Sequence, residues 1–229
     1  VVKVVVKLKI KMAHTYKVRY FNFTARGEPI RMLLSYGEIP FEDERIARED
    51  WPKIKPTTPL GQLPVLEIDG KQIPHSISIC RYLASIVKLD GKDAKENLRI
   101  DVAVETLLDL QKLAFEYVFE TDAAKKDEKN KKVKESVPLF LGKLEEHAKQ
   151  NGGYTALDRL SWADIIFICI YEGLMNILGK NTFDSYPSLQ KIKKNVLDVK
   201  SIRNWIKNRP ETPSTMGPLK FEYDLKQEV

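Results

Sequence analysis

"LPVLEIDGKQIPHSISICRYL", residues 63–83, contains the elements that decide the fold. Residues 63–68, a short and largely apolar run, and the shorter stretch 71–73 predict two strands. The Asp69-Gly70 pair between them is a strong signal for a hairpin turn. A helix is expected directly afterwards, over 76–89.

The start of that helix is a candidate anion site. Ser76 is the expected N-cap, because its short hydroxyl side chain can accept a free backbone N–H of the first turn. Those N–H groups and the positive end of the helix dipole attract anions. The residues alone leave two interpretations open: Ser76 caps its helix, or His75-Ser76 binds an anionic ligand.

The chain before residue 63 alternates between expected strands and helices. Residues 15–23 have the alternating pattern of a strand, and 27–37 predict a helix with proline in its first turn and glycine at its end. A second, more exposed strand is expected over 40–46. The proline-broken stretch 49–62 is expected to be irregular, with one short helical turn.

The chain after residue 95 is expected to be helical throughout. The polar stretch 90–95 predicts a linker. Residues 160–178 open with Ser161 and Asp164 at capping-box spacing and are apolar nearly all round, which indicates a buried central helix. The other helices are expected over 97–119, 130–149, 186–199 and 201–210.

These elements predict a fold class of α/β plus all-α: an N-terminal thioredoxin-like domain and a C-terminal helical bundle. The first domain has the element order of thioredoxin, but it lacks the Cys-x-x-Cys pair of thioredoxin chemistry. Tyr20 stands at the end of the first strand instead. The expected parts are an extension over 1–12, the thioredoxin-like domain over 13–89, a linker over 90–95, the helical domain over 96–212 and a tail over 213–229.

The composition is that of an ordinary soluble protein. The chain has 229 residues, of which 43% are hydrophobic and 31% charged. No run approaches the roughly 18 apolar residues that a membrane span requires. Cys80 and Cys169 give neither a disulfide framework nor a metal-binding spacing, which favours a reducing, cytoplasmic location.

The net charge of +6 suggests a nucleic-acid partner, but its distribution argues against one. The first eleven residues hold four of the lysines, so the rest of the chain carries only +2. The basic run at 125–134 is interrupted by Asp127 and Glu128 and contains no aromatic residue for base stacking. A solvated helix face is the better interpretation.

Residues 1–11, VVKVVVKLKIK, match no targeting signal. Lysines interrupt the apolar stretch that a secretory signal needs, and the Arg/Ser bias of a transit peptide is missing. The segment is interpreted as an extension. An added edge strand is the alternative, because β-branched residues dominate it.

Four stretches resemble one known family when taken in order: YKVRYFNFTARGEPIR, EDWPKIKPTTPLGQLPVLEIDGKQ, HSISICRYLA and SWADIIF. They resemble cytosolic glutathione transferases of the sigma class, with invertebrate enzymes and prostaglandin D-forming isomerases most similar. The resemblance covers about residues 13–212. It implies that glutathione binds to the thioredoxin-like domain and that an apolar pocket faces the helical domain. It also implies a homodimer in which each site borrows one acid from the neighbouring subunit.

The resemblance assigns the anion at the start of the helix. It is the γ-glutamyl carboxylate of glutathione, to which Ser76 offers its hydroxyl and N–H, with His75 beside it. The backbone of Leu63, turned outward by a cis Pro64, is implied to pair with the cysteinyl unit. An ordinary proline before a strand is the alternative.

The glycyl end of glutathione is implied to lie by the proline-broken stretch. Trp51 and Lys55 match the pair that binds the glycyl carboxylate, because an indole N–H and an ammonium are both hydrogen-bond donors. Gln62 fits the same end of the tripeptide. Asp109 matches the acid that is lent across the dimer to the glutathione amine. Without the resemblance it would be a surface helix residue.

Tyr20 matches the catalytic tyrosine of the family. The reaction needs a thiolate, and a free thiol titrates near pH 8.5, so about neutral pH it is mostly protonated. A phenol O–H donated to sulfur favours the charged form. Arg26 matches an arginine beside the sulfur, where a fixed cation helps further. A packed core aromatic and a solvent-facing loop charge are the alternatives for Tyr20 and Arg26.

Several positions depart from the family pattern. Glutamine is usual where His75 stands. The prostaglandin isomerases gather three aspartates around a divalent metal, and the matching positions here are Glu105, Leu108 and Asp109. Phe115 and Tyr117 stand where such an enzyme has a tryptophan in its pocket wall. No metal site is therefore expected, and prostaglandin specialisation is disfavoured.

The predicted function is a glutathione transferase that conjugates glutathione to apolar electrophiles such as lipid-peroxidation aldehydes. It would act by thiolate stabilisation and proximity, with glutathione as co-substrate and no metal. The expected partner is a second copy of the chain, with no nucleic acid and no membrane. A glutathione-dependent prostaglandin D isomerase and a non-catalytic, crystallin-like relative are the alternatives.

Overall fold

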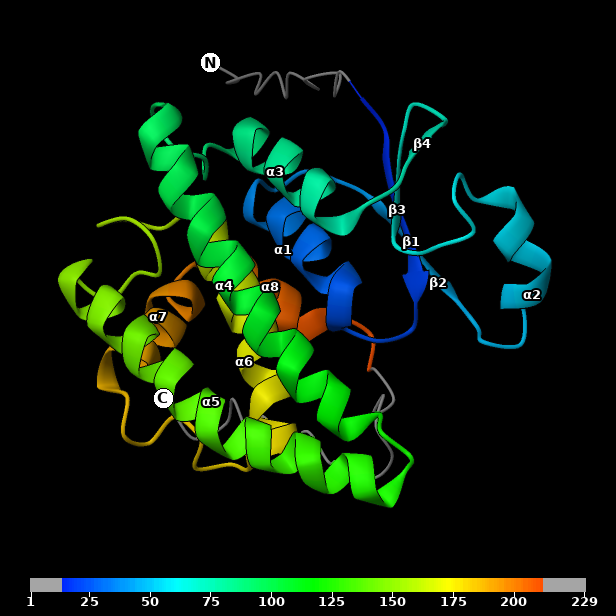
Figure 1. The fold of residues 1–229 in the computed structure, drawn as a ribbon. Coiled ribbons are helices and arrows are strands. Elements are labelled where there is room, and N and C mark those ends of the chain that lie inside the picture. Colours follow the sequence, from blue (N-terminus) through cyan, green and yellow to red (C-terminus); the bar gives the residue numbers. More distant parts are fainter. Residues whose placement is uncertain (1–13, 212–229) are drawn as a thin grey trace, which may run out of the picture.

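The computed structural model describes residues 14–211, which form a four-stranded sheet with helices and a set of longer helices beside it (Figure 1). The predictions for residues 1–12, as an extension or as an added edge strand, lie outside the described residues. The prediction of a tail over 213–229 also lies outside them.

The sheet has the strand order β2-β1-β3-β4. Its strands are β1 Tyr16–Phe21, β2 Glu42–Ile46, β3 Val65–Ile68 and β4 Lys71–Ile73. β1 pairs in parallel with β2 and antiparallel with β3, and the hairpin of β3 and β4 forms the other edge. Along β1, buried residues alternate with partly exposed ones, as the sequence pattern predicts.

Helices cover both faces of the sheet. α1 Glu28–Tyr36 and α3 Ser76–Val87 lie together on one face, and the short α2 Trp51–Ile54 lies on the other (Figure 1). A 3-10 helix, Lys55–Thr57, directly follows α2. These elements have the thioredoxin-like order that the sequence predicts.

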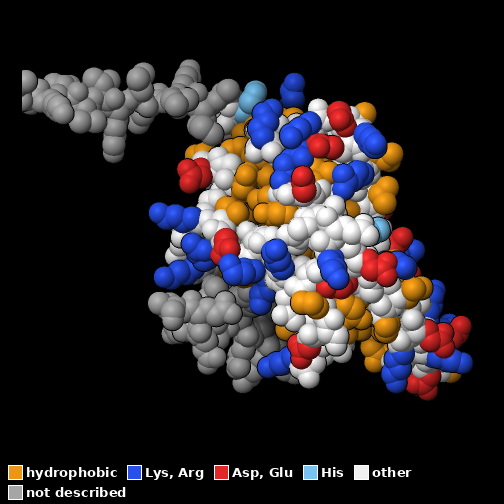
Figure 2. Space-filling view, turned by 90° about the vertical axis from the view of Figure 1, so that its left-hand side faces the viewer, with side chains coloured by type: hydrophobic (Ala, Val, Ile, Leu, Met, Phe, Trp, Pro, Cys, Tyr) orange, Lys and Arg blue, Asp and Glu red, His pale blue; other side chains and the backbone are white. Residues whose placement is uncertain are grey.

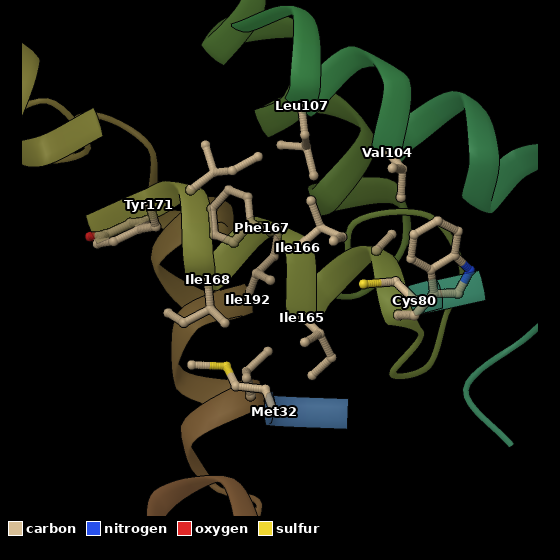
Figure 3. Close-up of a cluster of buried hydrophobic side chains, with 14 of the residues drawn as sticks. Met32, Cys80, Val104, Leu107, Ile165, Ile166, Phe167, Ile168, Tyr171 and Ile192 are labelled. Carbon is tan, nitrogen blue, oxygen red and sulfur yellow. The ribbon is translucent and has the colours of Figure 1, made fainter. Parts of the chain in front are cut away.

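The helical part contains α4 Ala94–Val118, α5 Ala123–Gln150, α6 Trp162–Leu178, α7 Pro187–Leu197 and α8 Lys200–Asn208. Figure 3 shows α6 between α1 and α4, with Met32 toward Ile165 on one side and Leu107 toward Ile166 on the other. All four side chains are buried. The hydrophobic core is therefore shared by the two parts of the molecule.

The predicted capping box at the start of α6 is present. Ser161 donates its backbone N–H (2.8 Å) and hydroxyl (3.0 Å) to Asp164 Oδ2. Thr155 donates its N–H (2.7 Å) and hydroxyl (2.8 Å) to Asp164 Oδ1. α6 is buried along most of its length, so the prediction of a buried central helix is confirmed.

Three predicted boundaries are wrong. Ser76 is the first residue of α3 rather than its N-cap; His75 takes that position with φ of +71°. α4 begins at Ala94 rather than at the predicted residue 97, because Asp93 accepts the Glu96 N–H and caps the helix there. α5 begins at Ala123 rather than near residue 130, with Asp122 accepting the Lys125 N–H.

The charged surface is mixed. On the face drawn in Figure 2, Lys and Arg side chains stand among Asp and Glu, with hydrophobic areas between them. The basic run 125–134 lies on α5 and is mostly exposed, as the solvated-face interpretation predicts. Among residues 14–211, no helix has both the length and the apolar character needed to cross a membrane.

Candidate functional site

A cavity of about 350 Å³ lies where α1, α3, α4 and α6 meet. It brings together three of the predicted site residues: Arg26 from the loop after β1, Ser76 from the start of α3, and Asp109 from α4. The rest of its wall is largely apolar and includes Leu108, Phe115, Ile166 and Ile170. The cavity thus joins a polar end to an apolar wall.

Tyr20 lies next to this polar end, near the end of β1. Its side chain is 6% exposed, and the backbone N–H of Arg26 interacts with its hydroxyl. The loop can pass this close because residue 27 is glycine: a Cβ at Gly27 would lie only 2.4 Å from Tyr20 Cδ1. The sequence therefore places the Tyr20 phenol and the Arg26 loop in direct contact.

Burial raises the pKa of the Tyr20 phenol above its ordinary value of 10.0. The Arg26 N–H and the charges of Arg26 and Arg31 act in the opposite direction, but burial is the larger effect. The phenol consequently stays protonated at neutral pH. A protonated phenol can donate a hydrogen bond to a thiolate, which is the role that the sequence predicts.

The residues predicted for the glycyl end lie on the α2 side of the sheet. The Trp51 ring packs edge-on against Phe21, with ring centroids 5.5 Å apart. The Lys55 side chain passes beside Gly61, where a Cβ would lie 3.4 Å from Lys55 Cε, and Gln62 is exposed next to it. These residues do not line the cavity between the helices.

The segment between these residues and Ser76 has unusual backbone conformations at two of the predicted site positions. The Leu63-Pro64 peptide bond is cis, as predicted. His75 is exposed and has a φ of +71°, a region that a non-glycine residue seldom adopts. Ser76, half-buried, lines the cavity at the N-terminus of α3. A non-glycine residue with a positive φ, such as His75, often lies at a binding site.

The α4 wall differs in part from the expectation. Phe115 lines the cavity, but Tyr117 does not: its ring lies 5.8 Å from the Lys126 ammonium. Leu108 and Asp109 line the cavity, whereas Glu105 does not. Within residues 14–211, no group of three or more His, Cys, Asp or Glu side chains has the arrangement of a metal site.

Comparison with known proteins identifies the family. The family model for the N-terminal domain of glutathione S-transferases matches residues 16–85, and the model for the C-terminal domain matches residues 108–209. The chain belongs to the glutathione S-transferase family. It is a two-domain glutathione S-transferase, as the resemblance predicts, and glutathione is the co-substrate of this family.

Several known proteins are similar to this chain over nearly their whole length. A glutathione S-transferase of Anopheles gambiae is 43% identical, and the match covers 86% of this chain and 98% of that one. Hematopoietic prostaglandin D synthase of Mus musculus is 35% identical with the same coverage. The solved structure of prostaglandin synthase D of Nilaparvata lugens is 43% identical, with a TM-score of 0.81 over 86% of this chain and 99% of that one.

The transferase cavity also has wall residues that the sequence analysis missed. Gln111, Lys112 and Glu116 of α4 line it, and Lys112 and Glu116 form a long ion pair of 3.9 Å. For Lys112 and Glu116 the spacing was a usable signal, because residues three and seven positions after Asp109 share its side of a helix, whereas Gln111, two positions after it, gives no such signal. Cys80 and Cys169 line the cavity too, although nothing in their sequence context indicates this.

Proposed function

We propose that this transferase conjugates glutathione to apolar electrophiles, including the α,β-unsaturated aldehydes formed by lipid peroxidation. The observation that carries the proposal is the cavity, whose apolar wall of Leu108, Phe115 and Ile166 faces the polar end at Arg26 and Ser76. An apolar electrophile in such a cavity lies next to the thiol. Proximity of this kind accounts for much of the rate that enzymes achieve.

Glutathione is proposed to lie along the edge that runs from α3 to α2. Ser76 and His75 would bind its γ-glutamyl carboxylate, because the first N–H groups of α3 are free donors there. The backbone of Leu63, before Pro64, would pair with the cysteinyl unit. The glycyl carboxylate would be bound by the remaining donors of this edge: Trp51, Lys55 and Gln62.

Tyr20 and Arg26 are proposed as the catalytic residues. The thiol proton leaves to water, and the Tyr20 O–H and the Arg26 cation stabilise the resulting thiolate. The sulfur then forms a bond to the β-carbon of the aldehyde. The electron pair of the C=C bond moves toward the carbonyl, and a proton from water ends on the α-carbon, so no oxidant is required.

A prostaglandin D isomerase is the second candidate. It is favoured by the mouse and Nilaparvata lugens relatives, whose names state that activity. Against it stands the α4 wall, where Leu108 replaces one acid of the isomerase cluster. Leucine cannot coordinate a hard cation such as Mg²⁺.

The protein is proposed to be a homodimer located in the cytoplasm. Cys80 and Cys169 are both free thiols, which suits a reducing compartment. The surfaces of α3 and α4 carry exposed apolar side chains, namely Tyr82, Ile86, Leu98 and Val102. A second subunit would cover them. Neither nucleic acid nor membrane is proposed as a partner.

A substrate panel tests the proposed function. The protein should be retained on immobilised glutathione, conjugate chlorodinitrobenzene, and turn over 4-hydroxyalkenals faster as their alkyl chain lengthens. Retention without conjugation of any electrophile would support the crystallin-like alternative. Faster conversion of prostaglandin H2 to D2 than of any aldehyde would support the isomerase.

A magnesium titration tests the α4 wall separately. Because Leu108 interrupts the acid cluster, up to millimolar Mg²⁺ should leave the KM for glutathione unchanged within about twofold. Leu108→Asp, which restores the missing acid, provides the matched variant and should introduce a response to Mg²⁺. A several-fold shift in the parent protein would contradict the proposed absence of a metal.

A further inference from the structure

A buried ionic cluster connects the loop that follows Tyr20 with the C-terminal end of α8. Its centre is Glu28, the first residue of α1, which is 1% exposed and follows Arg26-Gly27 directly. Glu28 Oε1 accepts hydrogen bonds from Trp205 Nε1 (2.8 Å) and Arg209 Nη1 (2.7 Å). Its Oε2 accepts one from Arg31 Nη1 (3.3 Å). One carboxylate thus receives donors from α1, from α8 and from the residue after α8.

Arg31 extends the cluster to the backbone between Tyr20 and Arg26. Its guanidinium is fully buried and donates to the carbonyls of Phe21 (3.4 Å) and Phe23 (2.9 Å), one and three residues after Tyr20. Its Nε also donates to Asp43 Oδ1 (2.8 Å) on β2. The guanidinium carbon lies 5.8 Å from the centroid of the Tyr20 ring. Arg31 therefore contacts both the ring of Tyr20 and the loop that carries Arg26.

The α8 end of the cluster is held in place by contacts of its own. The Trp205 ring packs against Phe41, with centroids 5.5 Å apart. Arg209 is 15% exposed and also lies 3.7 Å from a carboxylate oxygen of Glu172 on α6. The position of Glu28 is thus set by helices at the opposite end of the sequence.

Stability alone does not account for such a cluster. Moving a charged group out of water costs several kcal/mol, and the attraction within a buried ion pair offsets only part of this cost. Well-packed hydrophobic residues of the same volume would often stabilise the fold equally well or better. The ionic cluster additionally provides directional hydrogen bonds. Because each bond has a preferred length and angle, the loop has one favoured position.

We propose that Glu28, Arg31, Trp205 and Arg209 are positioning residues: by fixing the loop against which the phenol lies, they hold Tyr20 in the geometry needed to activate the thiol of glutathione. The inference rests on the proposed function, because it assumes that Tyr20 stabilises the thiolate. It adds that the C-terminal end of the helical domain supports the reactive group of the other domain. A displacement of about 1 Å in such a group can cost up to roughly 10²-fold in rate.

Two conservative variants test the proposal. Trp205→Phe keeps a ring against Phe41 but removes one donor to Glu28, and Arg209→Met removes the second donor while keeping much of the side-chain volume. For each, kcat, KM, Tm and the pKa of the bound glutathione thiol are measured, the last from thiolate absorbance. Both variants should raise the thiol pKa and lower kcat by about three- to tenfold, with KM for glutathione within about twofold of the parent.

Arg159→Met is the matched control. Arg159 forms a bidentate ion pair with Glu96. Like the cluster, this pair joins two segments, the first turn of α4 and the loop before α6, but neither residue lines the cavity. It should lower Tm without changing the thiol pKa. If Trp205→Phe and Arg209→Met behave like this control, the cluster is only structural and the proposal is wrong.

A double-mutant cycle with Tyr20→Phe tests whether the cluster affects kcat through Tyr20. If the cluster acts through Tyr20, Trp205→Phe should change kcat by less than about twofold in the Tyr20→Phe background, because coupled residues are non-additive. Additive losses would overturn the proposal. If Tyr20→Phe alone leaves the thiol pKa unchanged, the activation step of the proposed function is wrong and the inference falls with it. If Tyr20→Phe raises the thiol pKa and the cluster variants do not, only the inference is wrong.

Discussion

The Tyr20 hydroxyl is both buried and close to a cation-bearing loop. It is buried, which keeps the phenol protonated, and it lies against the loop that carries Arg26. A buried hydroxyl in a protein core normally binds a backbone carbonyl and is then unavailable to a ligand. The Arg26 N–H donates to the Tyr20 hydroxyl oxygen, which leaves the phenol proton to be donated to a thiolate.

Replacing Tyr20 by phenylalanine tests this role. Tyr20→Phe should lower kcat by about 10²-fold, the contribution of one positioned proton donor, and should raise the pKa of the bound thiol. Glutathione affinity should change little, because the other proposed contacts remain. Steady-state kinetics and calorimetric titration measure the two effects. Unchanged turnover would show that Tyr20 is only a packed aromatic residue.

For single residues, the sequence predicted part of the grouping of side chains but not every local conformation; the chemical roles stay predictions. The chain does bring Arg26, Ser76 and Asp109 to one cavity. The N-cap of α3 was wrong because His75 has a positive φ, for which the usual sequence signals are glycine and asparagine. The assignment of Tyr117 to the cavity was wrong because residues two positions apart on a helix point about 200° apart, so with Phe115 in the cavity wall the Tyr117 ring lies by Lys126 instead.

At the scale of elements, the start of α6 depends on one buried carboxylate. Asp164 accepts four hydrogen bonds from Ser161 and Thr155, and all three residues are buried. Removing the acceptor leaves those donors without partners away from water, a situation that is costly for each group. The central helix and the loop before it should therefore loosen together.

Asp164→Ala should lower the free energy of unfolding by about 3 kcal/mol, as expected for a buried cap with several donors. Asp122→Ala provides the matched control, since Asp122 caps α5 through one hydrogen bond and is exposed. It should cost about 1 kcal/mol or less. Urea unfolding measures the free energy of unfolding of both variants. Equal decreases in the two variants would show that Asp164 contributes no more than an ordinary exposed cap.

The ion pair between Glu96 and Arg159 should make stability depend on pH. Hydrogen bonds from the Arg159 guanidinium, and then from the Lys92 N–H, lower the pKa of Glu96 from 4.5 to about 2. Because the folded pKa lies below the unfolded one, the contribution is present in full above about 4.5 and is lost as the pH falls toward 2. The Tm difference between the parent and Arg159→Met should therefore be smaller at about pH 3 than at about pH 6. A Tm difference that grows as the pH falls would contradict this prediction.

The accuracy of the predicted element boundaries follows the strength of their local signals. α6 begins where its capping box predicts, because Ser161 and Asp164 are both explicit in the sequence. The first turns of α5 were missed because their charged residues are exposed and give no apolar periodicity. The boundaries of the two domains and of the linker, within 89–96, stay a prediction.

At the scale of the whole molecule, α3 and α4 carry apolar side chains that no part of the described chain covers. Tyr82, Ile86, Leu98 and Val102 are between 38% and 62% exposed. The two helices are joined across this surface by the ion pair of Arg81 and Asp101, at 3.1 Å. Exposed apolar side chains gathered on two neighbouring helices are typical of an interface between subunits.

A charge introduced on this surface should dissociate the proposed dimer. Leu98→Glu and Val102→Glu place a carboxylate where the partner would pack, and both should run as monomers in sedimentation experiments. Leu139→Glu is the matched control: Leu139 is 64% exposed, but it lies on α5. This variant should remain a dimer. Dimeric Leu98→Glu and Val102→Glu proteins would place the interface elsewhere.

The same variants decide which subunit uses Asp109. Within a single chain Asp109 already lines the cavity that Ser76 lines, whereas the family resemblance implies that it serves the neighbouring subunit. If it acts across the dimer, monomeric Leu98→Glu should bind glutathione as weakly as Asp109→Ala does, and adding Asp109→Ala to Leu98→Glu should weaken binding no further. If it acts within its own chain, the monomer should keep the affinity of the parent, and Asp109→Ala should reduce binding equally in both backgrounds. Calorimetric titration of the parent, the two single variants and the double variant separates the two cases. If Asp109 acts in the neighbouring subunit, glutathione affinity depends on dimer formation; if it acts in its own chain, the affinity does not.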